Sequence, residues 1–155
     1  MIAKLNPEQI DRLLREEVIG RIACAEGGFV YIVPISYAYD GRAIYVHSLE
    51  GKKMEIMRKN PNVCFEVDNI QDLSNWQSVV VRGTFKELSG EQRSKALEFL
   101  LNRPLPLSSS ATTHLGSNWP FYYDELKEIG GVVFEIEVKE KTGRYETSSA
   151  SPYFV

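Results

Sequence analysis

Two consecutive lysines stand where a helix is expected to begin, in the stretch IYVHSLEGKK at 44–53. The positive end of the helix dipole disfavours cations, so Lys52 and Lys53 should each cost about 0.3–1 kcal/mol there. A phosphate would reverse that cost, because it would accept hydrogen bonds from free backbone N–H groups, the lysines and the Ser48 hydroxyl. A solvated turn with Glu50 beside the lysines explains the same residues, and both interpretations stay open.

The second candidate is Val33-Pro34-Ile35-Ser36, inside an otherwise continuous apolar run. Proline cannot donate to a sheet ladder, so it marks an edge strand or a bulge. Backbone N–H and C=O groups around Pro34 can then pair with a ligand, and a flat heterocycle with alternating acceptors and donors would suit them. A barrel edge bent by Pro34 accounts for the same pattern without a ligand.

His47 is the one candidate catalytic side chain, and a hydrogen-bonded structural histidine is the alternative interpretation. The other histidine, His114, lies in a Pro/Ser/Thr-rich stretch, so a two-histidine metal site is not expected. The sequence has no metal signature, no paired-carboxylate motif and no Ser-His-Asp spacing. We therefore expect no metal.

Four further side chains have a structural and a functional interpretation. Cys24 and Cys64 lie in apolar runs and are expected to be buried free thiols. Arg82 interrupts an apolar run and is expected to pair with a carboxylate, for which Glu66 is the candidate. Trp76 packs as an aromatic or stacks on a planar ligand.

Apolar spacing and turn residues predict the elements that position these side chains. Asn6-Pro7 provides an N-cap and a first-turn proline, and Gly27-Gly28 and Asp40-Gly41 mark tight turns. Segment 103–120 is predicted to be a long loop, and the apolar tail 142–155 is expected to dock on this or another subunit. The expected strands span 19–26, 29–39, 43–47, 63–68, 78–88 and 131–138, and the expected helices span 7–17, 51–60 and 90–102.

Six strand-like segments with few, short helices indicate a mainly β protein, an antiparallel barrel in a single domain over 1–155. The first three strands are expected to form a meander. Strand 29–39 is apolar on both faces, which indicates that both are covered. The barrel interior covers one face, and a partner subunit is expected to cover the other, as in a homodimer.

Charge and hydropathy argue against several classes of partner. The net charge is −3 and no basic stretch alternates with aromatics, so nucleic acid is not expected. No apolar run approaches about 18 residues, so no membrane span is expected. The first residues lack the apolar core of a secretory signal, and a cytoplasmic protein is expected.

Taken together, GRIACAEGGFVYIVPISYAYDGRAIYVHSLEGKKMEIMRKNPNVCFEVD at 20–68 and WQSVVVRGTFKEL at 76–88 resemble a known family. It is the pyridoxamine 5′-phosphate oxidase-like, FMN-binding split-barrel family, and the nearest subgroup is the flavin-binding proteins related to nitroimidazole-resistance proteins. The resemblance implies a six-stranded antiparallel split β-barrel, mainly β with short helices. It also implies a homodimer that binds FMN at its interface.

The resemblance also implies roles for particular residues. A first set would contact the flavin ring through the backbone, a second would hold or neighbour the phosphate and ribityl chain, and a third would approach the flavin from the second subunit. His47 would also belong to the active site. The three sets are Val33, Pro34, Ile35 and Ser36; His47, Ser48, Lys52 and Lys53; and Trp76, Gln77 and Ser78.

The leading functional hypothesis is therefore an FMN-dependent oxidoreductase that acts on a small molecule. The resemblance implies that its activity is nitroreductase-like. The vitamin B6 substrate signature of the true oxidases is not evident. Two alternatives stay open, a non-catalytic flavin-binding or storage protein and a split barrel that uses deazaflavin or haem.

Overall fold

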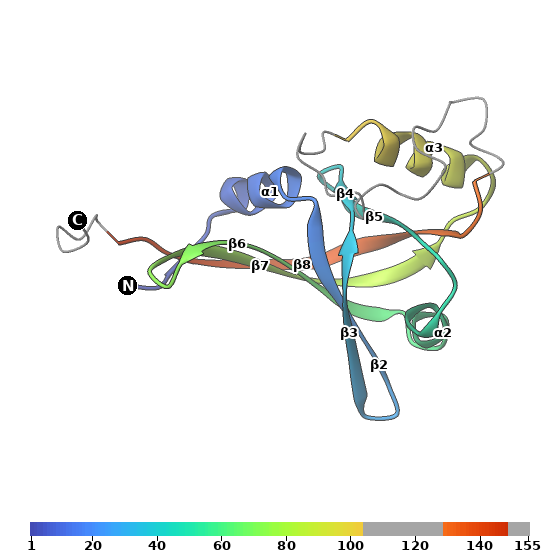
Figure 1. The fold of residues 1–155 in the computed structure, drawn as a ribbon, viewed down its shortest axis with the longest axis horizontal. Coiled ribbons are helices and arrows are strands. Elements are labelled where there is room, and N and C mark those ends of the chain that lie inside the picture. The colour runs from blue at the N-terminus through green and yellow to red at the C-terminus, as the bar shows by residue number, and fades with distance from the viewer. Residues whose placement is uncertain (104–128, 149–155) are drawn as a thin grey trace.

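The computed structural model describes residues 1–103 and 129–148 and is built mainly from β-strands (Figure 1). This confirms the predicted mainly β, antiparallel architecture. The helices are α1 (Pro7–Glu16), α2 (Lys52–Lys59) and α3 (Gly90–Leu101). The strands are β1 (Ala3–Lys4), β2 (Ile19–Glu26), β3 (Phe29–Ser36), β4 (Ala38–Tyr39), β5 (Ala43–Ser48), β6 (Asn62–Asp72), β7 (Asn75–Glu87) and β8 (Val132–Glu146).

The described strands form one antiparallel sheet in the order β3-β2-β6-β7-β8-β5-β4, with β1 paired to β8. The strands at the two ends of this order, β3 and β4, are separated in the chain by Tyr37 alone. The sheet must therefore curl round on itself, as a barrel does. Its interior is filled by fully buried apolar side chains, among them Ile22, Ile44, Phe65 and Phe134.

Tyr37 divides the strand that the sequence predicts over 29–39. Its backbone N–H donates to Val18 O at 3.1 Å, and its buried hydroxyl donates to Leu14 O at 2.8 Å. These bonds direct Tyr37 to the connection between α1 and β2 instead of a sheet ladder. The first part of the strand consequently pairs with β2, whereas β4 pairs with β5.

The last strand is longer than predicted. Residues 142–146, which the sequence assigns to a docking tail, continue β8 and pair with β7. Gly143 and the charged residues around it give this segment no strand-like pattern in the sequence. In the structure a Cβ at Gly143 would lie 2.8 Å from Leu5 Cδ1, so the strand closely contacts the N-terminal segment. The rest of the tail from 149 on, and the predicted loop from 104 on, lie outside the described residues.

Helix α1 is fixed to the barrel by a polar cluster. Lys141 Nζ donates to Asp11 Oδ1 at 2.6 Å, and the Tyr39 hydroxyl donates to the same oxygen at 2.9 Å. An N-terminal capping box formed by Asn6 and Gln9 sets where the helix begins. No helix within 1–103 or 129–148 is long and apolar enough to cross a membrane.

Asp11→Asn is expected to lower the free energy of unfolding at pH 7 by about 1–3 kcal/mol, because Lys141 loses its charge-assisted partner. Burial pushes the pKa of Asp11 up, but the hydrogen bonds from Lys141 and Tyr39 outweigh it and hold the pKa below its usual value. This stabilisation is therefore present above the unfolded pKa of about 3.9 and is lost as the pH falls through the folded pKa. Urea unfolding at several pH values measures it, and a difference from wild type that does not shrink in acid would contradict this account.

Candidate functional site

The N-terminus of α2 has backbone donors without acceptors. Gly51 is the N-cap and provides no side-chain cap. The N–H groups of Met54 and Glu55 both bond to Gly51 O, at 3.1 and 3.2 Å, whereas those of Lys52 and Lys53 have no acceptor among the described residues. The helix therefore begins where the sequence predicts, with two cations and two free donors in its first turn.

Glu50 does not neutralise these lysines. Both of its oxygens accept hydrogen bonds from Arg58, each at 2.7 Å, and Arg58 also bonds to Glu87. This arrangement lowers the pKa of Glu50. In the described part of the chain neither lysine has an ion-pair partner, and Lys52 Nζ lies 5.5 Å from the centroid of the Tyr31 ring. The solvated-turn interpretation relied on Glu50 as the counter-ion of the lysines, and Glu50 does not have that role here.

The segment Val33–Ser36 forms the C-terminal end of β3, which is a terminal strand of the sheet order. The edge that Pro34 predicts is therefore confirmed, and the second edge of β3 has no strand partner along this segment among the described residues. Ile35 is buried, whereas Val33 and Ser36 are half-buried and Pro34 is exposed. Backbone N–H and C=O groups at this edge can form hydrogen bonds with a ligand.

His47 and Ser48 end β5 and lie against the Gly130-Gly131 turn. His47 Nε2 lies 2.7 Å from Gly130 O, and because a carbonyl oxygen only accepts, Nε2 must carry the proton. Gly131 has φ +83°, and a Cβ there would lie 2.6 Å from Ser48 O, so this turn requires glycine. His47 Nδ1 has no hydrogen-bond partner among the described residues and is left for another partner.

Arg103 is a site residue that the sequence analysis missed. It follows α3, and its Nη2 donates to Ser36 Oγ at 2.9 Å. Its Nε is buried without a hydrogen-bond partner among the described residues, and burial lowers the pKa of its guanidinium. A single arginine before a Pro/Ser/Thr-rich stretch carries no periodic signal, so only the fold reveals that it reaches β3.

Trp76, Gln77 and Ser78 begin β7, next to the β6–β7 turn, and Figure 1 shows that turn far along the molecule from α2. Within one chain the structure therefore does not bring them to the lysines. They also do not share a face, because side chains alternate along a strand. Ser78 Oγ donates to Glu66 Oε1 at 3.1 Å and Trp76 Nε1 to Glu146 Oε2 at 3.2 Å, while Gln77 projects from the opposite face.

The expected ion pair of Arg82 with Glu66 is wrong. Arg82 pairs with Glu140 at 3.2 Å, and Glu66 instead accepts from Arg21, which also bonds to Asp68. Each correct partner comes from a neighbouring strand or hairpin, which local spacing does not show.

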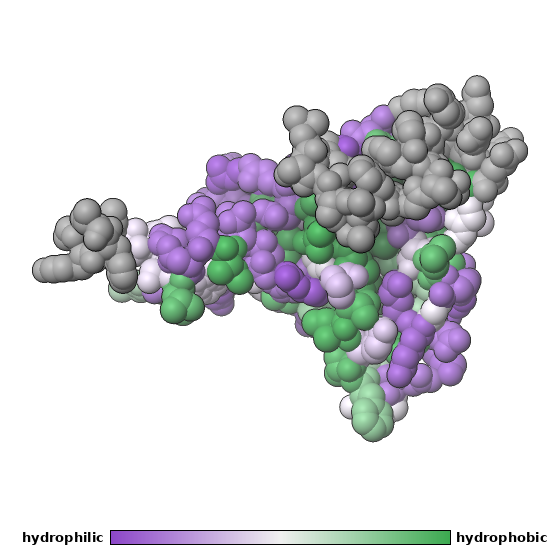
Figure 2. Space-filling view, in the orientation of Figure 1, coloured by the Kyte–Doolittle hydropathy of each residue, from purple (hydrophilic) through white to green (hydrophobic). Residues whose placement is uncertain are grey.

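The β2–β3 hairpin exposes the apolar residues Phe29, Val30 and Ile32, which are 82, 72 and 61 % exposed. Val30 and Ile32 share one face of β3 and form an apolar patch, whereas Phe29 projects from the other face. Figure 1 shows this hairpin projecting from the rest of the chain, and in Figure 2 its tip is hydrophobic. Adjacent exposed apolar side chains of this size mark a surface that another molecule covers.

The chain and its fold match known proteins. The family model described as pyridoxamine 5′-phosphate oxidase matches residues 6–145. An FAD-binding protein from Mesorhizobium loti is 30 % identical, with 95 % of this chain and 99 % of that chain covered and a TM-score of 0.72. A structure from Bacteroides thetaiotaomicron VPI-5482, assigned to 5-nitroimidazole antibiotic resistance, shares the fold at 18 % identity. The match covers 94 % of this chain and 87 % of that chain, with a TM-score of 0.70.

The chain belongs to the pyridoxamine 5′-phosphate oxidase family. An uncharacterized protein of Rhizobium meliloti (strain 1021) is 39 % identical over 88 residues, which are 57 % of this chain. The match spans 58 % of that relative's length. The family resemblance expected from the strand order and from VPISYAYDG, IYVHS and GKK is thereby confirmed.

Proposed function

We propose that this chain is an FMN-binding homodimeric flavoprotein, an oxidoreductase that acts on a small molecule. The observation that carries the proposal is the first turn of α2, where Lys52 and Lys53 have no ion-pair partner among the described residues and Glu50 is bound to Arg58. The family and the FAD-binding protein of Mesorhizobium loti support a flavin as the ligand.

The residues present suit the two ends of a flavin mononucleotide. Lys52, Lys53 and the free N–H groups beside them would bind the 5′-phosphate, with Ser48 and His47 at the neighbouring strand end. The open edge of β3 at 33–36 would pair with the hydrogen-bonding edge of the ring system. Flavin, when bound, supplies the hydride and electron transfer, and the protein positions it.

Arg103 adds a positive charge beside the β3 edge through its bond to Ser36. A buried guanidinium that has no carboxylate partner among the described residues favours an anion next to it. In the proposed site it would stabilise negative charge on the reduced ring or hold an anionic group of the substrate. Both roles need the guanidinium to stay where Ser36 holds it.

A second copy of the chain would complete the site. The apolar patch of Val30 and Ile32 provides a surface for it, and Trp76 and Ser78 lie near the start of β7, beside the β6–β7 turn that Figure 1 shows far from α2. We expect the partner's copies of these two residues to approach the flavin. The homodimer thus accounts for both groups of residues with one assembly.

Turnover distinguishes an oxidoreductase from a flavin-storage protein. We expect the flavin-loaded dimer to oxidise NADH or NADPH with a small-molecule acceptor, and His47→Gln to lower kcat by about 10²-fold with unchanged flavin content, since a positioned proton donor or acceptor contributes about 10²–10⁴-fold. Steady-state kinetics with a panel of acceptors, including nitro compounds, is the measurement. Flavin-loaded protein that turns over with no donor or acceptor would favour storage instead.

A further inference from the structure

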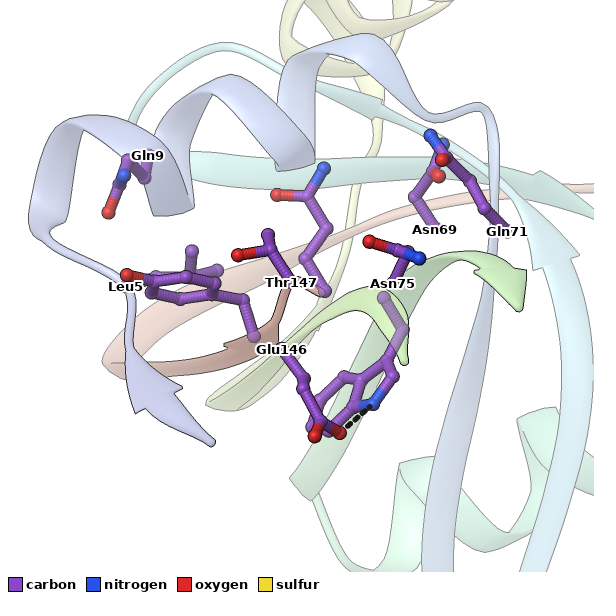
Figure 3. A pocket seen from close by; sticks show the side chains of 10 residues that line it. Leu5, Gln9, Asn69, Gln71, Asn75, Glu146 and Thr147 are labelled. Atoms are coloured by element: carbon purple, nitrogen blue, oxygen red, sulfur yellow. Dashed lines mark hydrogen bonds between the residues drawn. The ribbon is translucent and has the colours of Figure 1, made fainter. Parts of the chain in front are cut away.

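A pocket of about 280 Å³ opens between α1 and the β6–β7 hairpin, at the end of the barrel away from α2. Figure 3 shows side chains from α1, the hairpin and the end of β8 converging on it. Mouths of β-barrels are preferred places for small ligands. Its lining is unusual in holding five side-chain amides, those of Gln9, Asn69, Gln71, Asn75 and Gln77.

The amides continue the inward-facing rows of the barrel. Val67 and Val79 are fully buried on β6 and β7, and two residues further along each strand the same face carries Asn69 and Gln77. Asn69 lies opposite Gln77, and Gln77 lies opposite Tyr145 on β8. The interior therefore changes from apolar to amide-lined at this mouth, beside a phenol ring.

Some of these amides maintain the local structure. Asn75 bonds through both of its side-chain atoms to Asp72 and Ser148, and Asn69 Nδ2 donates to Glu17 Oε1 at 2.8 Å. The half-buried Gln77 amide, in contrast, has no hydrogen-bond partner among the described residues. Its two N–H donors and the two lone pairs of its oxygen are therefore available, and Gln77 is placed to bind a ligand.

The charge of the lining excludes anionic ligands. No lysine or arginine of the described residues lines the pocket, and its single carboxylate, Glu146, accepts a hydrogen bond from Trp76 Nε1 (Figure 3). Leu5 and Tyr145 contribute apolar and aromatic surface, which suits a flat ring. The pocket is thus built for a neutral, planar molecule whose edge both donates and accepts.

We propose that this pocket binds an adenine-type ring. A glutamine amide pairs with adenine through one donated and one accepted hydrogen bond, and the half-buried Gln77, which has no partner among the described residues, can do so here. The ring can belong to a free nucleoside or to the adenine half of a dinucleotide, whose phosphates would stay outside. The proposal does not depend on flavin binding at α2, because adenosine alone is sufficient to test it.

Calorimetric titration of the full-length protein with adenosine is the experiment, repeated with Gln77→Leu and with Gln92→Leu, which removes an exposed amide from α3 outside the pocket. We expect adenosine to bind wild type and Gln92→Leu alike, and to bind Gln77→Leu at least about ten-fold more weakly. Gln71→Leu, at an exposed position of the same lining, provides a second variant if Gln77→Leu does not fold. No adenosine binding to wild type, or equal binding to the Gln77 and Gln92 variants, would overturn the proposal.

The same variants identify the source of the ring. If it is half of a dinucleotide, FAD binds wild type more tightly than FMN does, and Gln77→Leu removes that difference. If it is a free nucleoside, adenosine binds with FMN already present and the two flavins bind alike. Failure of flavin binding with adenosine binding intact would overturn the proposed function and leave this pocket assigned.

Discussion

Replacing both Lys52 and Lys53 by alanine is expected to weaken FMN binding by at least about 10²-fold without destabilising the apo-protein. Each charge-assisted hydrogen bond to the phosphate contributes about 1.5 kcal/mol or more, and 1.4 kcal/mol corresponds to ten-fold in affinity. Without a ligand, both cations oppose the helix dipole, at about 0.3–1 kcal/mol each. The apo double variant should therefore unfold at an equal or higher denaturant concentration than the wild type.

Calorimetry with FMN and urea unfolding of the apo-protein measure these two opposite effects. Lys95→Ala is the matched control, because Lys95 is an exposed lysine on α3 whose ion-pair partner within 1–103 and 129–148 is Glu91 alone. It should leave FMN affinity unchanged. Unchanged affinity in the double variant would refute the phosphate site, and a loss of apo stability would show that the lysines have a structural role.

If the proposed homodimer forms, replacing Ile32 by glutamate is expected to convert it into a monomer that no longer retains FMN. Ile32 lies in the exposed patch of β3 and is 61 % exposed in a single chain, so the charge costs little in the monomer. In a dimer that covers the patch, an unpaired buried carboxylate would cost several kcal/mol. The flavin site would then lose the residues that the partner contributes.

Light scattering measures the mass, which should fall from twice 17.6 kDa to 17.6 kDa, and flavin absorbance should fall with it. Gln92→Glu places one carboxylate on the exposed surface of α3 and should remain a flavin-bound dimer. A wild-type protein that is monomeric and binds FMN, or an Ile32→Glu dimer with full flavin content, would contradict the shared site.

Much of the fold could be predicted because its signals are local. Asn6-Pro7 sets the start of α1, Gly27-Gly28 sets the β2–β3 turn, and Pro34 identifies the edge strand. The break at Tyr37 could not be predicted, because it depends on a hydroxyl that reaches Leu14 O across the barrel. The part of β8 that the sequence does not predict, up to residue 146, is charged and contains Gly143. It forms a strand by pairing with β7.

The candidate site shows the same division. The lysine pair and the β3 edge carry local signals, whereas Arg103 acquires its place only when the end of α3 packs beside Ser36. The family resemblance implies one role for Trp76, Gln77 and Ser78. The two-residue period of a strand separates them, placing Gln77 in the amide-lined pocket and Ser78 against Glu66.

Identification of the ligand in the purified protein tests the central proposal most directly. We expect a yellow protein with the absorption bands of oxidised flavin, and heat denaturation should release FMN, identified by mass, at one molecule per chain. Apo-protein should take up added FMN to the same stoichiometry. A colourless protein that takes up no FMN, or one that releases haem or a deazaflavin instead, would contradict the proposed function.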